Sequence, residues 1–149
     1  MAIVKIVPGA LAHIGPILDQ LRDEEKEYLE QNVGTYNIAV QEFYLSSFVC
    51  TGLIDEIPVC MWGVKRSTVL NDAATVWLLP TRRIDEHKFL FIRHSLLVLE
   101  ELLREFASIN GLTLATNCRS LRWLKWLGCK IEPTENPRIH YFERHRNGD

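Results

Sequence analysis

Hydrophobic and polar positions follow two different periods along the chain, one typical of strands and the other typical of helices. Residues 3–7 predict a short strand that stops at Pro8-Gly9. From 11 to 28 the apolar residues recur every three or four positions, which predicts one helix that fades near 32–34. Residues 39–47 predict a second, shorter helix.

The middle of the chain predicts three strands. Residues 48–54 and 59–66 form two of them, joined by a tight turn at Asp55-Glu56. Residues 75–79 are continuously apolar, which is typical of a strand buried on both faces. Pro80 ends the pairing of that strand, because proline has no backbone N–H to donate.

The clearest element is a long helix, because apolar residues occupy one stripe of it and charged residues occupy the other faces. The stripe consists of Phe89, Ile92, Leu96, Leu99, Leu102, Leu103 and Phe106. Asn110-Gly111 supplies the expected stop of this helix, and residues 112–116 predict the next strand. Strands at 130–132 and 139–143 are expected to close the chain, with a polar tail from about 143.

The order of these elements predicts an α/β fold. A strand, a long helix and a strand favour a right-handed crossover and a parallel pair, whereas the hairpin before them must be antiparallel. We therefore expect a mixed, mostly antiparallel sheet of about six to seven strands with a central parallel pair and helices on both faces. No repeat or linker interrupts residues 1–149, so a single domain is expected.

Composition and charge narrow the classes of function. The 149 residues include 47% hydrophobic and 24% charged residues, a mixture typical of globular proteins, and the formal net charge is -2. Such a charge gives no field that favours nucleic acid or an anionic membrane. No apolar run approaches the roughly 20 residues of a membrane span, and the N-terminus lacks the features of a signal peptide. We therefore expect no nucleic-acid partner, no membrane association and no secretion.

The four cysteines form no C-x-x-C pair and have no histidine at metal-ligand spacing, so no metal site is expected. They are Cys50, Cys60, Cys118 and Cys129. Cys50 and Cys60 could face each other across the predicted hairpin, where a disulfide is geometrically conceivable. Reduced, buried thiols are the simpler interpretation.

The segment 117–130 carries the most specific pattern in the chain: a strand end, a short amphipathic helix, a glycine stop and a new strand. Its Asn117-x-x-Ser120 and Leu127-Gly128-Cys129 resemble the Asn-x-x-Ala…Gly-Phe block of the GNAT N-acetyltransferase superfamily. Residues 120–128, Ser-Leu-Arg-Trp-Leu-Lys-Trp-Leu-Gly, most resemble the small GNAT-like proteins of short-tailed bacteriophages.

The resemblance implies a place for acetyl-CoA. In GNAT enzymes two central strands splay apart around it, and its pyrophosphate rests on backbone N–H groups at the start of the long helix. By resemblance, residues 77–79 and 113–116 would be the splayed strands. The implied cofactor-binding residues are Leu78, Leu79, Arg82, Arg83, His87 and Asn117.

The chain departs from the superfamily in its phosphate loop. The pattern Gln/Arg-x-x-Gly-x-Gly/Ala falls on residues 82–87, where Arg82 fits but Asp85 and His87 replace the two small residues. Side chains there obstruct the close approach of the backbone to phosphates. Acidic residues at this point also stabilise a helix N-terminus that binds no ligand.

A second departure concerns proton transfer. The tyrosine that the superfamily often uses as general acid falls on Leu124, which has no proton to donate. Cys118 or Cys129 could substitute in principle, although a thiol here is more often part of the core. The available candidates for a general base lie in no recognisable motif, and we assign no catalytic residue. They are Glu42, Asp55, Glu56 and His87.

Aromatic and basic residues coincide in the predicted C-terminal helix. Arg119, Arg122 and Trp126 share one face, while Trp123 and Leu127 share another. Arg119, Arg122, Trp123 and Trp126 are candidates for a docking surface, since tryptophan and arginine are favoured interface anchors. The alternative is one tryptophan in the core, with the basic residues in water.

Three hypotheses of function follow. The first is a GNAT-fold bacteriophage protein without catalysis, acting in virion assembly or in the particle, in the host cytoplasm or the virion. Its partners would be other phage or virion proteins, self-association included, and it would need no cofactor. The second is an active N-acetyltransferase that uses acetyl-CoA, with Arg82 and Arg83 holding the phosphates. The third is a regulatory module that binds acyl-CoA without catalysis.

Overall fold

The computed structural model describes residues 2–30, 35–66 and 72–147. The expected fading of the first helix near 32–34 falls outside them. The elements in chain order are β1 (Val4–Pro8), α1 (Leu11–Asp19), α2 (Asp23–Glu30), α3 (Thr35–Leu45), β2 (Phe48–Ile54), β3 (Ile57–Arg66), β4 (Ala73–Pro80), the 3-10 helix η1 (Arg82–His87), α4 (Lys88–Glu105), β5 (Ser108–Leu114), α5 (Cys118–Trp126), β6 (Lys130–Pro133) and β7 (Ile139–His145).

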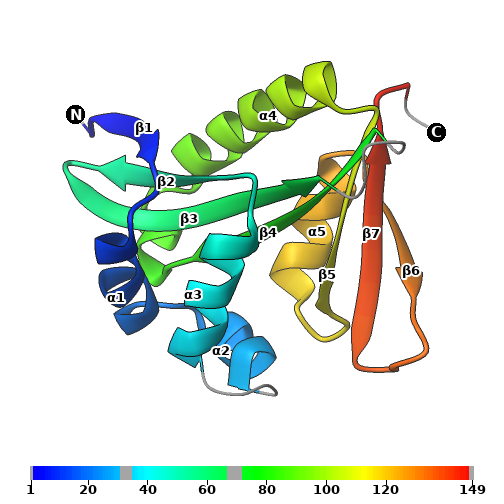
Figure 1. Cartoon of the computed structure of the whole chain (residues 1–149), viewed down its shortest axis with the longest axis horizontal. Coiled ribbons are helices and arrows are strands. Elements are labelled where there is room, and N and C mark those ends of the chain that lie inside the picture. Colours follow the sequence, from blue (N-terminus) through cyan, green and yellow to red (C-terminus); the bar gives the residue numbers. More distant parts are fainter. Residues whose placement is uncertain (1, 31–34, 67–71, 148–149) are drawn as a thin grey trace. The chain divides into compact units, whose positions relative to one another are not determined.

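The strands form a seven-stranded mixed sheet in the order β1-β2-β3-β4-β5-β7-β6 (Figure 1). β4 and β5 run parallel, whereas β1 with β2, β2 with β3, β5 with β7 and β6 with β7 run antiparallel. The structure thus confirms the predicted α/β class, the mostly antiparallel sheet and its parallel pair. Backbone contacts divide the chain into two compact units, Met1–Lys65 with Trp77–Phe89 and Arg66–Val76 with Leu90–Asp149. The single domain stays a prediction.

The first unit has a core built between the helices and the hairpin. Its buried members are Ile14, Ile17, Leu21, Ala39, Met61 and Leu79. Trp77 packs against this cluster. In Figure 1 the helices α1, α2 and α3 gather below strands β2 and β3 of the same unit. Ile14, Leu18 and Leu21 of the expected apolar stripe therefore face a core, whereas Leu11 is exposed.

The single helix predicted for 11–28 is wrong, because the structure has two helices there. Between them Leu21 forms a bridge with Thr81, and Arg82 donates its backbone N–H to the carbonyl of Gln20 at 2.8 Å. Arg22 donates in turn to the carbonyl of Pro80 at 3.3 Å. These pairings with the end of β4 replace helical hydrogen bonds. The apolar period runs through the break because Leu21 is fully buried.

The cysteines are all free thiols. In the hairpin register Cys60 lies opposite Gly52 and Cys50 opposite Trp62, so the two cysteines are not direct cross-strand neighbours. Burial raises the pKa of Cys60 to about 12 and that of Cys129 to about 11. These two thiols therefore stay protonated at neutral pH. The expected burial is right for them, whereas Cys50 is half-buried and Cys118 is exposed.

The second unit contains most of α4 and its apolar stripe. Leu99, Leu102, Leu103 and Phe106 are buried, which confirms the C-terminal half of the stripe. The prediction is wrong for Phe89, which exposes 91% of its surface. Phe89 lies in the first turn of the helix, beyond the part of α4 that belongs to this core.

The helix stop predicted at Asn110-Gly111 is also wrong, because both residues lie inside β5. A Cβ atom on Gly111 would lie 2.5 Å from Cζ of Phe142 and 2.8 Å from the carbonyl oxygen of Val76. Glycine is therefore required here by the close packing of a strand, not by the end of a helix. Asn110 is equally part of the sheet, since its Oδ1 accepts a hydrogen bond from Thr75 at 2.8 Å.

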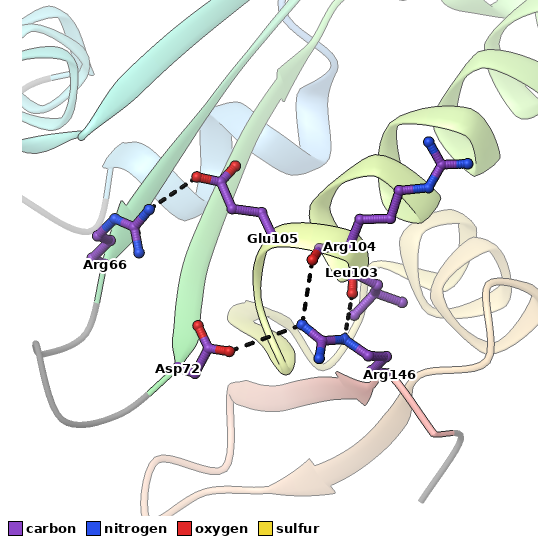
Figure 2. Close-up of polar contacts among 6 residues, drawn as sticks. All are labelled: Arg66, Asp72, Leu103, Arg104, Glu105 and Arg146. Atoms are coloured by element: carbon purple, nitrogen blue, oxygen red, sulfur yellow. Dashed lines mark hydrogen bonds and ion pairs between the residues drawn. The ribbon is translucent and has the colours of Figure 1, made fainter.

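The polar tail predicted from about 143 begins later, since β7 runs through His145. Arg146 then caps the C-terminal end of α4: its Nε donates to the carbonyl of Leu103 at 2.6 Å and its Nη2 lies 3.5 Å from that of Arg104 (Figure 2). Nearby, Arg66 pairs with Glu105 at 2.9 Å. A cation at this position is favourable, because the last carbonyls of a helix have no partner within it.

We expect Gly111→Ala to lower the free energy of unfolding by about 1–3 kcal/mol, because the added methyl group must displace Phe142 or the backbone. Gly15→Ala is the matched control. Nothing lies within 4 Å of the Cβ that it adds, and alanine is the better residue in a helix. Urea denaturation measures both. Equal stability of the two variants would contradict the packing argument.

Candidate functional site

The strand β4 carries the first part of the implied acetyl-CoA site. In its parallel ladder with β5, residues 73–75 pair with residues 108–110. β4 continues to Pro80 beyond that ladder and includes Leu78 and Leu79. The residues of β4 predicted to be buried on both faces are half-buried from Thr75 to Leu78. The splay itself concerns parts of the two strands that belong to different units, and it stays a prediction.

Trp77 fixes the second half of β4 to its own unit. Its indole lies so close to Gly63 that a Cβ there would be 2.3 Å from the ring. Its Nε1 donates to Oγ of Ser46 at 2.7 Å, and Ser46 donates to the carbonyl of Glu42 at 2.7 Å. The side chain is therefore held both by packing and by a chain of hydrogen bonds, which ties β4 to the end of α3.

The segment that corresponds to the phosphate loop is the short helix η1. Ile84 is buried within it, and its N–H donates to the carbonyl of Thr81 at 3.2 Å. Asp85 accepts a hydrogen bond from the guanidinium of Arg22 at 3.0 Å, and the side chain of Arg22 is only 11% exposed. The Asp85 carboxylate is thus a partner for a nearly buried cation of the same unit, which gives it a structural role.

The residues of η1 do not fit a backbone cradle for the pyrophosphate of CoA. Such a cradle needs two positions without obstructing side chains, and they hold Asp85 and His87. Cationic side chains are present instead: Arg82 is exposed and Arg83 is half-buried. The Nε of Arg83 is buried and has no hydrogen-bond partner among the described residues. The side chains of Arg82 and Arg83 are therefore the cationic groups of η1 that could meet a phosphate group.

Asn117 belongs to the second unit and caps α5. It is 4% exposed, and its Oδ1 accepts a hydrogen bond from the backbone N–H of Ser120 at 3.2 Å. Capping by asparagine is favourable, because the first N–H groups of a helix otherwise lack partners. The conserved-looking spacing Asn117-x-x-Ser120 has a local structural cause. Its predicted part in cofactor binding stays a prediction.

The position of the usual general acid is apolar and buried. Leu124 is 4% exposed and offers no proton. Of the two thiols in the same segment, Cys118 is exposed at the start of α5, whereas Cys129 is buried. Removal from water raises the pKa of Cys129, with the charge of Arg144 opposing the rise. Of these two thiols Cys118 is the exposed one, and its substitution for the tyrosine hydroxyl stays a prediction.

The candidates for a general base belong to the first unit, and three of them have structural partners. Glu42 pairs with Lys65 at 2.6 Å, and Glu56 pairs with Lys5. Asp55 accepts a hydrogen bond from the backbone N–H of Ile3 at 2.9 Å. His87 is half-buried at the end of η1. The described contacts give none of these groups an acid–base partner.

The two tryptophans of α5 take different positions. Trp123 donates from Nε1 to Oγ of Ser95 at 3.1 Å, and its ring centroid lies 5.4 Å from that of Phe91. Trp126 is 56% exposed. Trp123 therefore holds α5 against α4, while Trp126 lies on the surface with the exposed Arg119, Arg122 and Lys125. The sequence left two alternatives open: both indoles in a docking surface, or one indole in the core. Trp123 is half-buried and Trp126 is exposed, and the docking surface stays a prediction.

Among the described residues no group of three or more His, Cys, Asp or Glu side chains is arranged to hold a metal ion. None of the helices in this part of the chain is long and apolar enough to cross a membrane.

No family model and no curated protein matches the chain. Solved structures do match it. A GNAT-family acetyltransferase from Bacillus anthracis is 10% identical, with 97% of this chain and 95% of that chain covered and a TM-score of 0.72. The aminoglycoside acetyltransferase AAC(6')-Ib in complex with coenzyme A is 15% identical, with 98% and 96% covered and a TM-score of 0.66.

A third structure, RimL, a ribosomal alpha-N-protein acetyltransferase in complex with coenzyme A, is 10% identical. Here 98% of this chain and 96% of that chain are covered, and the TM-score is 0.69. At identities this low, the structural match establishes the fold and leaves the activity open. The chain has the fold of the GNAT acetyltransferases, as the resemblance in residues 117–130 implied.

We expect Asp85→Asn to lower the free energy of unfolding by about 1–3 kcal/mol, because it leaves the nearly buried guanidinium of Arg22 without its counter-charge. Glu101→Gln is the matched control. This substitution removes an ion pair with Arg104, in which the side chain of Glu101 is 69% exposed and that of Arg104 is 74% exposed. It should lower the free energy of unfolding by less than about 0.5 kcal/mol. If Asp85→Asn cost no more than the control in urea denaturation, η1 would not depend on this pair.

Proposed function

We propose that this chain is a GNAT-fold protein that does not transfer acetyl groups and acts through protein–protein contacts. The observation that carries the proposal is the occupation of the phosphate-loop segment by structural side chains, above all Asp85 in its pair with Arg22. The buried Leu124 supports it, since the usual proton donor is missing from that helix. The side chains in the phosphate-loop segment disfavour binding of the cofactor, and the apolar Leu124 cannot protonate its leaving thiolate.

The setting that we propose for these contacts is a bacteriophage, either in virion assembly or as a component of the particle. This part of the proposal rests on the resemblance of residues 120–128 to GNAT-like proteins of short-tailed phages. The proposed partners are other phage or virion proteins, or further copies of the chain. The exposed Trp126 on a basic helix supplies a surface suited to such contacts.

A second candidate is an active N-acetyltransferase that uses acetyl-CoA. The observation in its favour is the pair of arginines in η1, with the Nε of Arg83 buried and without a partner among the described residues. Arginine binds phosphate well, because its planar donors match two oxygens at once. Structures of two enzymes with this fold contain coenzyme A. In this candidate Arg82 and Arg83 replace the glycine loop.

A third candidate is a regulatory module that binds acyl-CoA but does not react with it. It shares the arginines of η1 with the second candidate and the buried Leu124 with the first. Binding without turnover distinguishes it from both.

We expect isothermal titration of the purified protein with acetyl-CoA, and separately with CoA, to show no binding at millimolar ligand. The physical reason is that η1 offers side chains and an acidic residue where the phosphates need free backbone N–H groups. Micromolar binding would contradict the proposal. Loss of that binding in Arg82→Ala and Arg83→Ala would then assign it to the arginines, and an assay of acetyl transfer to amines would separate the second candidate from the third. Arg93→Ala, an exposed arginine of α4, is the control.

We expect Trp126→Ala to change the free energy of unfolding by less than about 1 kcal/mol, since the indole is 56% exposed. Trp123→Ala should cost about 3 kcal/mol or more, because it removes the contact with Phe91 and leaves Ser95 without its donor. Thermal and urea unfolding compare the two variants. An unfolded Trp126→Ala variant would show that Trp126 is a core residue and would end its role as a docking anchor.

A further inference from the structure

We infer that the basic face of α5 binds the acidic α2 and the neighbouring apolar face of α3 on a second copy of the chain. The inference rests on the proposed function, since it names the partner of that docking surface. The surface on α5, termed the basic face, consists of Arg119, Arg122, Lys125 and Trp126.

The basic face has an unbalanced charge. Helix α5 contains three cationic residues and no acidic one within Cys118–Trp126. Lys125 lies in the last turn, where the helix dipole favours a cation, but Arg119 lies in the first turn, where the dipole opposes one. The helix dipole therefore does not explain the cation at Arg119. Trp126, 56% exposed beside these cations, provides apolar surface that water solvates poorly.

The opposite charge is concentrated on α2. Its sequence, Asp-Glu-Glu-Lys-Glu-Tyr-Leu-Glu, has five acidic residues and one basic residue. The dipole accounts for the acids of the first turn, but not for Glu27, which lies beyond them. Asp23 and Glu27 are exposed and stand four positions apart, on the same face of the helix. They form a row that complements Arg122 and Lys125.

An apolar surface accompanies this row on the same unit. Helix α3 contacts α2, and Figure 1 shows the two helices side by side. Its exposed residues include Tyr36 at 54%, Tyr44 at 67% and Leu45 at 60%. The exposed residues Asp23 and Glu27 of α2 are thus acidic, and on α3 two tyrosines and a leucine are exposed beside the polar Asn37 and Gln41. This matches a basic helix that also carries a tryptophan.

The size of each contribution decides which residue anchors the contact. Exposed ion pairs contribute only about 0–1 kcal/mol each, so Arg122 and Lys125 mainly steer and orient the encounter. Burial of an indole removes on the order of 150–250 Å² from water, which makes Trp126 the anchor. Two different surfaces meet in this contact. Copies therefore assemble as a two-fold dimer with two such contacts, as a ring, or as an open chain, depending on the angle between them.

A nucleic acid is the competing occupant of a basic aromatic helix, and the observations disfavour it. The formal net charge of the chain is -2, so its overall field repels phosphates. Three cations on one short helix neutralise few phosphates, whereas affinity for nucleic acid grows with that number. A second copy also satisfies the exposed apolar residues of α3, which a nucleic acid leaves unused.

Sedimentation velocity of the full chain at low salt tests the inference. The wild-type protein should associate, and salt at about 0.5 M should weaken the association by screening. Arg122→Glu and Glu27→Lys should each weaken it by about tenfold or more. Arg138→Glu, an exposed reversal outside both surfaces, should leave it unchanged. Mixing Arg122→Glu with Glu27→Lys should restore association, because opposite charges meet again.

A wild-type chain that stays monomeric at high micromolar concentration would overturn the inference. Association that neither reversal weakens, or that the mixture fails to restore, would overturn it as well. Binding of single-stranded DNA that Arg122→Glu removes, with a monomeric wild type, would replace the second copy by a nucleic acid. None of these outcomes bears on acetyl transfer, which the titration with acetyl-CoA decides separately, so the two proposals fail independently.

Discussion

The close approach of β4 to glycines in both neighbouring strands is the constraint on which the rest of the structure depends. Gly63 in β3 admits the indole of Trp77, and Gly111 in β5 admits the carbonyl of Val76 and the ring of Phe142. Val76 and Trp77 are consecutive residues, and each belongs to a different unit. A side chain on either glycine would therefore disturb the packing of its unit at the strand that both units share.

In the segment where the resemblance implies a cofactor site, side chains also make contacts that stabilise the fold. Asp85 holds Arg22, and Arg22 in turn follows the Leu21–Thr81 bridge that fastens the α1–α2 connection to the end of β4. In a glycine loop these positions would be left open for phosphates. Here the side chains stabilise η1 themselves. The carboxylate of Asp85 is thus already paired, whereas the buried Nε of Arg83 has no partner among the described residues.

Much of this architecture follows from the sequence, and the errors have a common cause. Strong local signals located the hairpin, β4, α4, α5 and the final strands. The failures at Leu21 and at Asn110-Gly111 arise where a long-range partner, Thr81 or Phe142, decides the backbone. The sequence alone does not distinguish a glycine that permits close packing from one that ends a helix. The pairing of Asp85 with Arg22, 63 positions apart, left no local signal either.

The fold and acetyl transfer therefore depend on different features of the chain. The fold of this chain depends on the glycines under Trp77 and Phe142, on the cap at Asn117 and on the turn at Gly128. Gly128 has a φ of +87°, and a Cβ there would lie 2.8 Å from Arg144. Acetyl transfer would need a phosphate cradle and a proton donor, which none of these four features supplies. Asp85 and Leu124 stand at positions that the resemblance assigns to the cofactor and to proton transfer, and in this chain they take part in an ion pair and in the core. The residues of segment 117–130 that resemble the superfamily thus have structural roles in this chain.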